Sequence, residues 1–243
     1  QLMDIDLISE NIVQLFNRST LLKGKKAVGT SGPAQEKIDP VRYISNFSSG
    51  IQGYEIAKAL RNAGARTTLI SGPTKLDQPL GMKFKKAETG KEFLNHSLTE
   101  LPADIYISVA AIADWKIENI SKQKIKKNKQ SNITLKFSKN TDVLYEVSKN
   151  NKRPSLVIGF AAETENLVEN AKKKLLKKKC DWIIANIVSD KLGFDEIDNK
   201  VTIVKEDMII EWPSLSKLNI AEKLVLEISE YFSKVKKEFL CQK

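Results

Sequence analysis

The sequence has a single histidine, and this scarcity restricts the chemistry that the chain can perform. His96 is the only one among 243 residues, and it lies in a predicted surface helix over Gly90–Glu100. A Ser-His-Asp enzyme uses histidine as its general base, and zinc sites commonly take imidazole ligands. We therefore assign His96 no role and expect chemistry based on electrostatics, phosphate binding and a hard metal ion.

Cysteines, apolar runs and aromatic residues are also few. The two cysteines, Cys180 and Cys241, have no metal-like spacing, which predicts a reducing, cytoplasmic location. No apolar run approaches the roughly 18 residues of a membrane span, and the amphipathic N-terminus has no secretory signal. The net charge of +10 predicts anionic partners such as a nucleotide, a phosphorylated metabolite or nucleic acid. The aromatic share of 7%, not interleaved with lysine, weakens the nucleic-acid-binding alternative.

The G-x-G-x-x-G fingerprint of dinucleotide-binding sheets is absent as well. The second predicted strand ends in "TTLISGPT", which has Ser and Gly where an acidic residue would bind a ribose. A dinucleotide-dependent reductase therefore remains only as an alternative function, beside a basic nucleic-acid-binding module.

The N-terminal third has the order strand, glycine loop, helix, strand. The predicted elements are a strand over Lys25–Gly32, a loop over Pro33–Phe47, a helix over Gly50–Ala63 and a strand over Arg66–Gly72. Ser48 or Ser49 is expected to cap the helix, with Ile56, Ala57 and Leu60 inward, and Gly64 to end it. This order is a βαβ unit, which favours a parallel sheet.

The alternation of strands and helices continues to the C-terminus. It predicts one Rossmann-like, doubly wound α/β domain with a mostly parallel sheet and an antiparallel hairpin appendage. Further helices are predicted over Asp4–Phe16, Gly90–Glu100, Asp142–Lys149, Thr164–Lys179 (with Leu167, Val168, Ala171, Leu175 and Leu176 inward) and Leu218–Ser233. Further strands are predicted over Asp104–Ala113, Asn132–Ser138, Ser155–Glu163 and Asp181–Asn186, with a basic loop over Lys122–Gln130 and a hairpin over Lys200–Trp212 that turns near Glu206-Asp207.

Four stretches near predicted strand ends and helix starts carry candidate site residues. In "SGIQG", Gly50 and Gly53 either admit a ligand to the helix N-terminus or allow close helix–sheet packing. In "AAIADW", small residues ending in Asp114 leave room for a ring and a sugar hydroxyl, or serve packing and capping. "KIKKNK" is either a polyphosphate clamp or a solvated loop. "GFAAET" ends a strand and enters a helix.

Together and in this order, these stretches resemble the phosphopantothenate–cysteine ligase family of coenzyme A biosynthesis. The similarity is carried by "DPVRYISNFSSGIQGYEIA", "AAIADW" followed by "KIKK", "KNTDVL" and "GFAAETENL…AKKKLLKKKCDWIIAN", and it runs from about Lys25 to at least Tyr231. The resemblance implies a ligase that joins 4′-phosphopantothenate to cysteine through an acyl-cytidylate. It consumes CTP, releases CMP and pyrophosphate, and uses a Mg²⁺ ion held mainly by the nucleotide phosphates.

The resemblance also implies a domain organisation. In the family's bacterial form, the ligase is usually the C-terminal half of a bifunctional chain whose N-terminal half is an FMN-dependent decarboxylase. "QLMDIDLISENIV" resembles the end of that half. Residues 1–22 are therefore predicted to be a remnant and linker from the decarboxylase, and residues 23–243 the CTP-dependent ligase domain, in which no FMN is expected.

Individual residues match the family's functional positions. Asn46 matches the residue that holds the acyl-cytidylate for attack by cysteine, and Arg42 a residue needed for turnover, whose fork suits a phosphate or carboxylate. Lys124 matches a lysine on the triphosphate, in a loop expected to close over bound nucleotide. Gly50 and Gly53 become the scaffold that lets the chain pass close to the substrate. The remaining matches are to nucleotide-binding positions: Ser108, Val109 and Ala110 beside the cytosine, Asp114, Asp142, Val143, Phe160 at the base, Lys174 and Lys178.

The sequence departs from the family pattern at several positions near these residues. Ala34 and Gln35 replace a Thr-Arg pair, which removes an arginine from a position suited to an anion contact, and Thr141 replaces a proline. Ile187 replaces an aspartate, and Ile51-Gln52 stand where Lys and Met are common. A homodimer is the family's usual state, and the hairpin over Lys200–Trp212 is a candidate interface.

Overall fold

The computed structural model describes residues 19–126, 132–188 and 198–241. The predicted helix over Asp4–Phe16 lies outside these residues, as does the end of the predicted basic loop. Among the described residues, no helix is both long enough and apolar enough to cross a bilayer.

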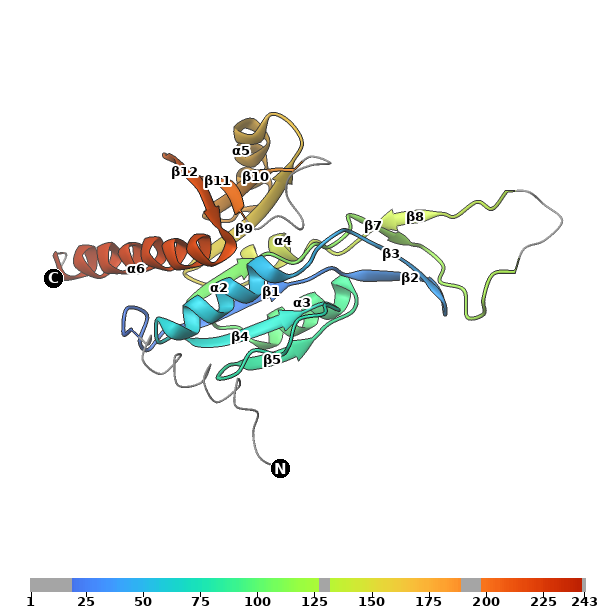
Figure 1. The fold of residues 1–243 in the computed structure, drawn as a ribbon, viewed down its shortest axis with the longest axis horizontal. Coiled ribbons are helices and arrows are strands. Elements are labelled where there is room, and N and C mark those ends of the chain that lie inside the picture. Colours follow the sequence, from blue (N-terminus) through green and yellow to red (C-terminus); the bar gives the residue numbers. More distant parts are fainter. Residues whose placement is uncertain (1–18, 127–131, 189–197, 242–243) are drawn as a thin grey trace, which may run out of the picture.

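One eight-stranded sheet forms the body of the chain, in the order β12-β11-β10-β9-β6-β1-β4-β5 (Figure 1). Strands β10, β9, β6, β1, β4 and β5 run parallel to one another, whereas β11 and β12 are antiparallel to their neighbours. This arrangement confirms the Rossmann-like, mostly parallel α/β fold. The strands are β1 (Lys26–Ser31), β4 (Arg66–Ser71), β5 (Lys83–Lys86), β6 (Ile105–Ser108), β9 (Leu156–Glu163), β10 (Trp182–Ile187), β11 (Asp198–Lys205) and β12 (Ile209–Ser216).

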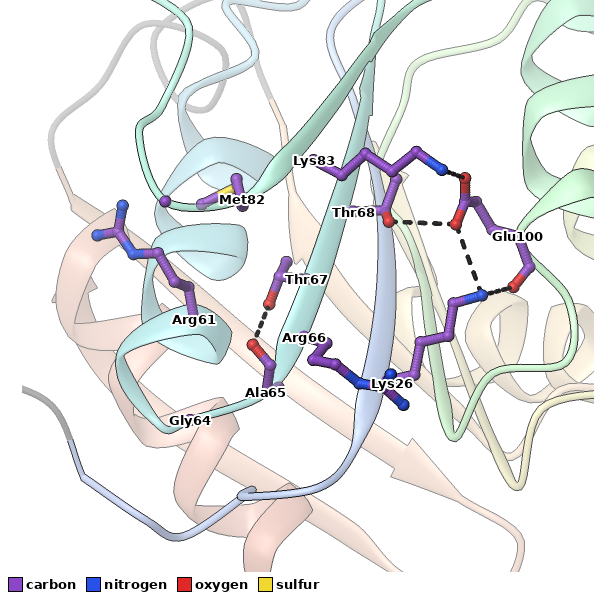
Figure 2. A pocket seen from close by; sticks show the side chains of 11 residues that line it. Lys26, Arg61, Gly64, Ala65, Arg66, Thr67, Thr68, Met82, Lys83 and Glu100 are labelled. Carbon is purple, nitrogen blue, oxygen red and sulfur yellow. Dashed lines mark hydrogen bonds and ion pairs between the residues drawn. The ribbon is translucent and has the colours of Figure 1, made fainter.

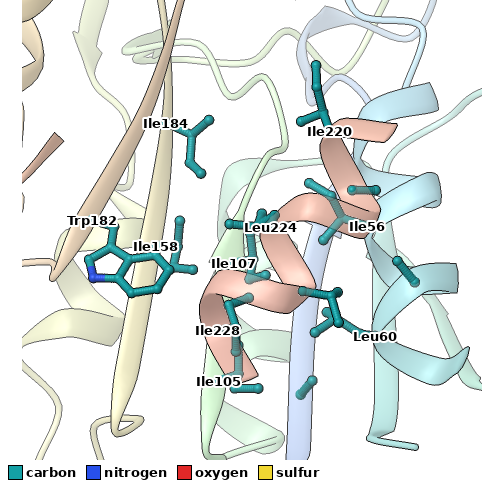
Figure 3. Packing of buried hydrophobic residues seen from close by; sticks show 14 of the residues in the cluster. Ile56, Leu60, Ile105, Ile107, Ile158, Trp182, Ile184, Ile220, Leu224 and Ile228 are labelled. Carbon is teal, nitrogen blue, oxygen red and sulfur yellow. The ribbon is translucent and has the colours of Figure 1, made fainter. Parts of the chain in front are cut away.

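Helices cover both faces of the sheet, because successive side chains of a buried strand point to opposite faces. Ile105 and Ile107 of β6 belong to one apolar cluster, and Tyr106 belongs to the other. The first cluster joins the sheet to α2 and α6, whose Leu60 and Leu224 point into the same core in Figure 3. The helices are α2 (Ile51–Asn62), α3 (Gly90–Thr99), α4 (Val143–Ser148), α5 (Leu167–Lys178) and α6 (Lys217–Cys241).

The C-terminal hairpin is part of the main sheet and is not a separate appendage. β11 pairs with β10, and its Val201 and Ile203 are buried in the core under α6. The turn falls where the sequence predicts it, since Lys205 N donates to Met208 O across residues 206 and 207. The hairpin over Lys200–Trp212 is therefore confirmed, with longer strands than predicted.

Two small antiparallel ladders form an arm that extends away from the main sheet (Figure 1). They are β2 (Gln35–Asp39) with β3 (Arg42–Ser45), and β7 (Trp115–Ile117) with β8 (Phe137–Lys139). The prediction of a loop over Pro33–Phe47 is therefore wrong. The cause is a local turn, in which Asp39 Oδ1 accepts hydrogen bonds from the N–H groups of Val41 and Arg42 at 2.9 Å.

Several strand boundaries differ from the predictions. The strand predicted over Asp104–Ala113 ends at Ser108, because its last residues turn away into a loop. Of the strand predicted over Asn132–Ser138, only the end pairs, as part of β8. The short edge strand β5 was not predicted, since "KFKK" has little apolar character.

Helix ends also depart from the predictions. Neither Ser48 nor Ser49 caps α2; its N-cap is Gly50, in the left-handed region at φ 80°. Gly64 does end this helix, at φ 91°, and its N–H donates to Arg61 O. In α5, Ala171 and Leu175 are buried as predicted, but Leu176 is 75% exposed, so its inward placement is wrong.

Candidate active site

A cavity of about 650 Å³ lies at the carboxyl ends of β1, β6 and β9. The strand order reverses between β1 and β6, because the chain runs outward through β4 and β5 before returning to β6. Ligands of open α/β sheets bind in the crevice at such a point. Of the predicted site residues, the cavity is lined by Asn46, Gly50, Gly53, Val109, Ala110, Asp114, Phe160 and Lys174.

Thr30 anchors one wall of this cavity. The paired register of β1 and β6 ends at the Thr30–Ser108 pair. The Thr30 hydroxyl accepts hydrogen bonds from both Val109 N and Ala110 N, at 3.2 Å each. The main chain of the predicted cytosine wall is therefore fixed by a buried side chain from the adjacent strand.

The start of α2 packs directly on the end of β1. Ser31 Oγ donates to Gly50 O at 2.7 Å. A Cβ atom at Gly53 would lie 2.4 Å from Ser31 Oγ and 3.0 Å from Thr30 O, closer than such atoms can approach. Close helix–sheet packing thus explains Gly53, and the same packing brings the N-terminus of α2 to the cavity, where its free N–H groups favour an anion.

A lysine from α5 provides a cation at the cavity wall. Lys174 Nζ donates to Phe160 O at 2.9 Å, and both residues line the cavity. Burial, and then the nearby Lys178, lower the pKa of Lys174. A buried ammonium group is stabilised by an opposite charge, so this lysine favours an anionic ligand over an empty cavity.

Four predicted nucleotide residues lie outside the cavity lining. Lys178 Nζ and Asp142 Oδ2 form an ion pair at 2.5 Å, and Asp142 Oδ1 caps α4 by accepting from Tyr145 N at 3.1 Å. Val143 is buried in the apolar core, and Ser108 is the last residue of β6. Lys174 and Lys178 therefore share a helix face but have different partners.

The other two predicted residues, Arg42 and Lys124, lie on the arm. Arg42 Nε donates to Asp39 Oδ2 at 3.0 Å, and Arg42 Nη2 donates to Ile125 O at 2.9 Å. Ile125 N in turn donates to Asp39 Oδ2 at 3.1 Å. Hydrogen bonding from Arg42 holds the pKa of Asp39 well below its usual range. The arrangement fastens the Lys124 loop to the β2–β3 turn, and neither Arg42 nor Lys124 lines the cavity.

The cavity includes residues that the sequence did not point to. Gln52, Asn186, Asn199 and Lys217 all contribute to its lining. Asn186 ends the strand "DWIIAN", so its position at a strand's carboxyl end was a usable signal. Asn199 and Lys217 come from β11 and the start of α6, and their approach depends on the hairpin folding back beside β10.

A second hollow, of about 570 Å³, lies at the amino ends of β1, β4 and β5, opposite the strand ends that border the first cavity (Figure 2). Its acidic group is already paired, because buried Glu100 accepts from Lys83 Nζ at 2.6 Å and pairs with Lys85 at 2.8 Å. Lys26 and Thr68 also contact this carboxylate. Burial alone would raise the pKa of Glu100, but the two lysines outweigh it and lower the pKa to about 2. This cluster ties the strand starts together through a carboxylate that already has its partners within the protein.

The sheet order, the cavity at its switch point and the buried cation define a Rossmann-like α/β domain with a site suited to an anionic ligand. The chain belongs to the family described as the DNA/pantothenate metabolism flavoprotein C-terminal domain, whose model matches residues 22–232.

Comparisons with individual proteins agree with this assignment. The chain is 37% identical over 227 residues to the coenzyme A biosynthesis bifunctional protein CoaBC of Borreliella burgdorferi, covering 93% of this chain and 57% of that protein. The corresponding protein of Bacillus subtilis is 38% identical, over 90% of this chain and 56% of its own length. The chain thus spans about half the length of these curated relatives.

Solved structures give the same result. The crystal structure of the C-terminal domain of CoaBC matches with a TM-score of 0.75 and 34% identity, over 89% of this chain and 100% of that one. A Cab2 variant in complex with phosphopantothenate-cysteine matches with a TM-score of 0.69, over 96% of this chain and 95% of that one, but at 13% identity this shows the fold alone. The family resemblance inferred from the motifs is confirmed.

Proposed function

We propose that this domain is the ligase that joins 4′-phosphopantothenate to cysteine, with CTP as co-substrate. The observation that carries the proposal is the cavity at the β1–β6 switch point, which gathers Asn46, Asp114, Phe160 and Lys174 from four separate parts of the chain. The 37% identical relative, named for coenzyme A biosynthesis, supports the same pathway.

In the first step, a carboxylate oxygen of 4′-phosphopantothenate attacks the α-phosphorus of CTP. The bond to the β-phosphate oxygen breaks, pyrophosphate leaves, and an acyl-cytidylate remains. Lys174 and the N-terminus of α2 both border the cavity, and their positive charge supports a role in neutralising the phosphates and the charge that develops on them.

In the second step, the amine of cysteine attacks the acyl carbon and CMP leaves. An amide bond forms and the attacking nitrogen gives up a proton. Asn46 lies on the loop between β3 and α2 and lines the cavity, so its side-chain amide is available to hold the acyl-cytidylate during this attack. Gly50 and Gly53 bring the main chain close to the same space.

A Mg²⁺ ion is the proposed metal cofactor. The described residues contain no group of three or more His, Cys, Asp or Glu side chains placed to hold a metal ion. Asp114 is an acidic side chain in the cavity lining, and it would be the protein ligand of a Mg²⁺ ion whose other ligands are nucleotide phosphates and water. When bound, the ion would neutralise phosphate charge.

We also propose a homodimer, and the arm is a better candidate interface than the hairpin over Lys200–Trp212. β11 of that hairpin is covered by α6, and the hairpin exposes Met208 and Ile209, whereas the arm exposes a larger set of large apolar side chains. Such side chains on an extended hairpin favour burial against a second copy of the chain. The exposed residues are Val41, Tyr43, Trp115, Ile120, Ile133 and Phe137.

The full-length protein is proposed to carry an FMN-dependent decarboxylase upstream of this domain. The support is that the curated relatives are bifunctional and that this chain covers little more than half of them.

The experiment is a three-substrate assay with Mg²⁺. With CTP and 4′-phosphopantothenate alone, the protein should release pyrophosphate and retain an acyl-cytidylate; added cysteine should then release CMP. ATP serves as the comparison nucleotide, in the assay and in thermal-shift titration. Absence of CMP with all three substrates present would contradict the proposal, and quenching of NAD(P)H fluorescence or retention of labelled RNA would favour the alternatives instead.

A further inference from the structure

The side chains of Glu36 and Asn140, outside the cavity lining, connect β2, the start of α3, the Asp114 loop and the turn between β8 and α4. Glu36 belongs to β2, and Asn140 lies between β8 and α4. Glu36 Oε1 accepts hydrogen bonds from Asn140 Nδ2 and from Gly90 N, the first N–H group of α3, at 2.8 Å each. The Glu36 residue is only 5% exposed. We call this pair the Glu36–Asn140 node.

Asn140 also forms hydrogen bonds directly with the main chain of the Asp114 loop. Its Nδ2 donates to Ala113 O at 2.9 Å, and its main-chain N–H donates to Asp114 O at 2.8 Å. Its Oδ1 accepts from Thr141 N at 2.8 Å. Two acceptors therefore face the amide nitrogen and one donor faces the oxygen, which fixes the orientation of the side chain.

The position of the node links the two acidic residues of the predicted nucleotide site. Ala113 and Asp114 lie on one side of Asn140, and Asp142 follows it two residues later as the cap of α4. Gly90 is packed so closely that an added Cβ would lie 3.2 Å from Asn140 Nδ2 and 3.1 Å from Ile112 Cγ2. The loop, the turn and the start of α3 are therefore joined by direct contacts.

We propose that Asn140 is a positioning residue for nucleotide binding, anchored by Glu36. It holds Ala113 and Asp114 in the orientation that presents the Asp114 carboxylate to the cavity. The inference rests on the proposed function, because it deepens the role of that site. Neither Asn140 nor Glu36 lines the cavity, so neither is a catalytic residue.

The first test combines kinetics with hydrogen exchange of Asn140→Ala. Without substrates, amides of residues 111–116 should exchange faster in the variant. With substrates, the KM for CTP should rise about tenfold or more, with kcat within about threefold of wild type. Asn150→Ala is the matched control, since the Asn150 side chain accepts a hydrogen bond from Lys152 N within a local turn. Unchanged exchange, or faster exchange with an unchanged KM, would overturn the proposal.

A single and a double variant at Asn140 and Glu36 distinguish a role in nucleotide binding from a role in fold stability alone. Asn140→Asp alone places two carboxylates together and should lower both Tm and CTP affinity. Adding Glu36→Gln removes one of the two facing negative charges, so Tm should recover in part; recovery is incomplete because Glu36 Oε1 serves both residue 140 and Gly90 N in the wild-type protein. The CTP KM should stay high, because an aspartate has no donor for Ala113 O. If the KM for CTP recovered together with Tm, the Glu36–Asn140 node would stabilise the fold without positioning the nucleotide site.

Failure of this inference is distinguishable from failure of the proposed function. If the wild-type protein forms no CMP, the ligase assignment is wrong. If wild type forms CMP and Asn140→Ala does so with the same CTP KM, the ligase assignment stands and the node has no positioning role.

Discussion

Lys174 Nζ lies 2.9 Å from the main-chain oxygen of Phe160, which places an ammonium group from α5 over the end of β9 at the cavity wall. Lys172, Lys173 and Lys177 of the same helix are exposed, and Lys178 pairs with Asp142. A single cation of this lysine-rich helix is thus selected by the fold to face the predicted ligand.

Lys174→Met should weaken nucleotide binding without destabilising the protein. We expect the KM for CTP to rise about tenfold, because a charge-assisted contact with a phosphate is lost. Since burial lowers the pKa of Lys174, its charged form is disfavoured in the folded state at neutral pH. That penalty is present below the lowered pKa and fades as pH rises, so the variant should have an equal or higher Tm near neutral pH. Steady-state kinetics and thermal denaturation check this, with Lys172→Met as the control; an unchanged KM would contradict it.

Gly53→Ala should destabilise the fold by about 1–3 kcal/mol, because the added methyl group would collide with Ser31 and with Thr30 O. Gly29→Ala is the matched control, since a Cβ at Gly29 would have no heavy atom within 4 Å. Urea unfolding of the two variants measures the difference. Equal stabilities would show that the contact between α2 and β1 is looser than the structure indicates.

Glu100→Gln should lower stability near neutral pH by about 2 kcal/mol, because the lysines that pair with the carboxylate lose a charged partner. The pKa of Glu100 is lowered from an ordinary 4.5 to about 2. Its stabilising contribution is therefore complete above 4.5 and is lost as pH falls from there toward 2. The gap between wild type and variant, measured by urea unfolding, should shrink over that range. A gap independent of pH would mean that the ion cluster contributes through packing alone.

Much of the fold follows from local patterns. The buried runs that became β1, β4, β9 and β10 are bounded by glycine and polar residues, and the helices between them carry apolar residues at helical spacing. Within the arm, only the strand over Asn132–Ser138 was predicted, and its end forms part of β8. The exposed strand β3 has no buried face that would mark it in the sequence. The turn at Asp39 was a usable signal for the β2–β3 hairpin.

The candidate site was predictable where it depends on strand ends, and less so where it depends on long-range packing. Strand ends account for the presence of Ala110, Asp114 and Phe160 in the lining. The separate partners of Lys174 and Lys178 depend on where Phe160 and Asp142 lie in space. Similarly, Lys217 reaches the cavity only because α6 packs across β11. Helical spacing places two lysines on one face but cannot assign their contacts.

The central claim is that an activated acyl group, bound in the cavity, is attacked by cysteine. The role proposed for Asn46 in this attack is the most specific part of that claim. The direct measurement is a rapid-quench time course of Asn46→Asp with CTP, 4′-phosphopantothenate, cysteine and Mg²⁺. The proposed function predicts that acyl-cytidylate accumulates while CMP release falls below the wild-type rate. Turnover of Asn46→Asp at the wild-type rate, with no accumulated intermediate, would contradict the role given to Asn46.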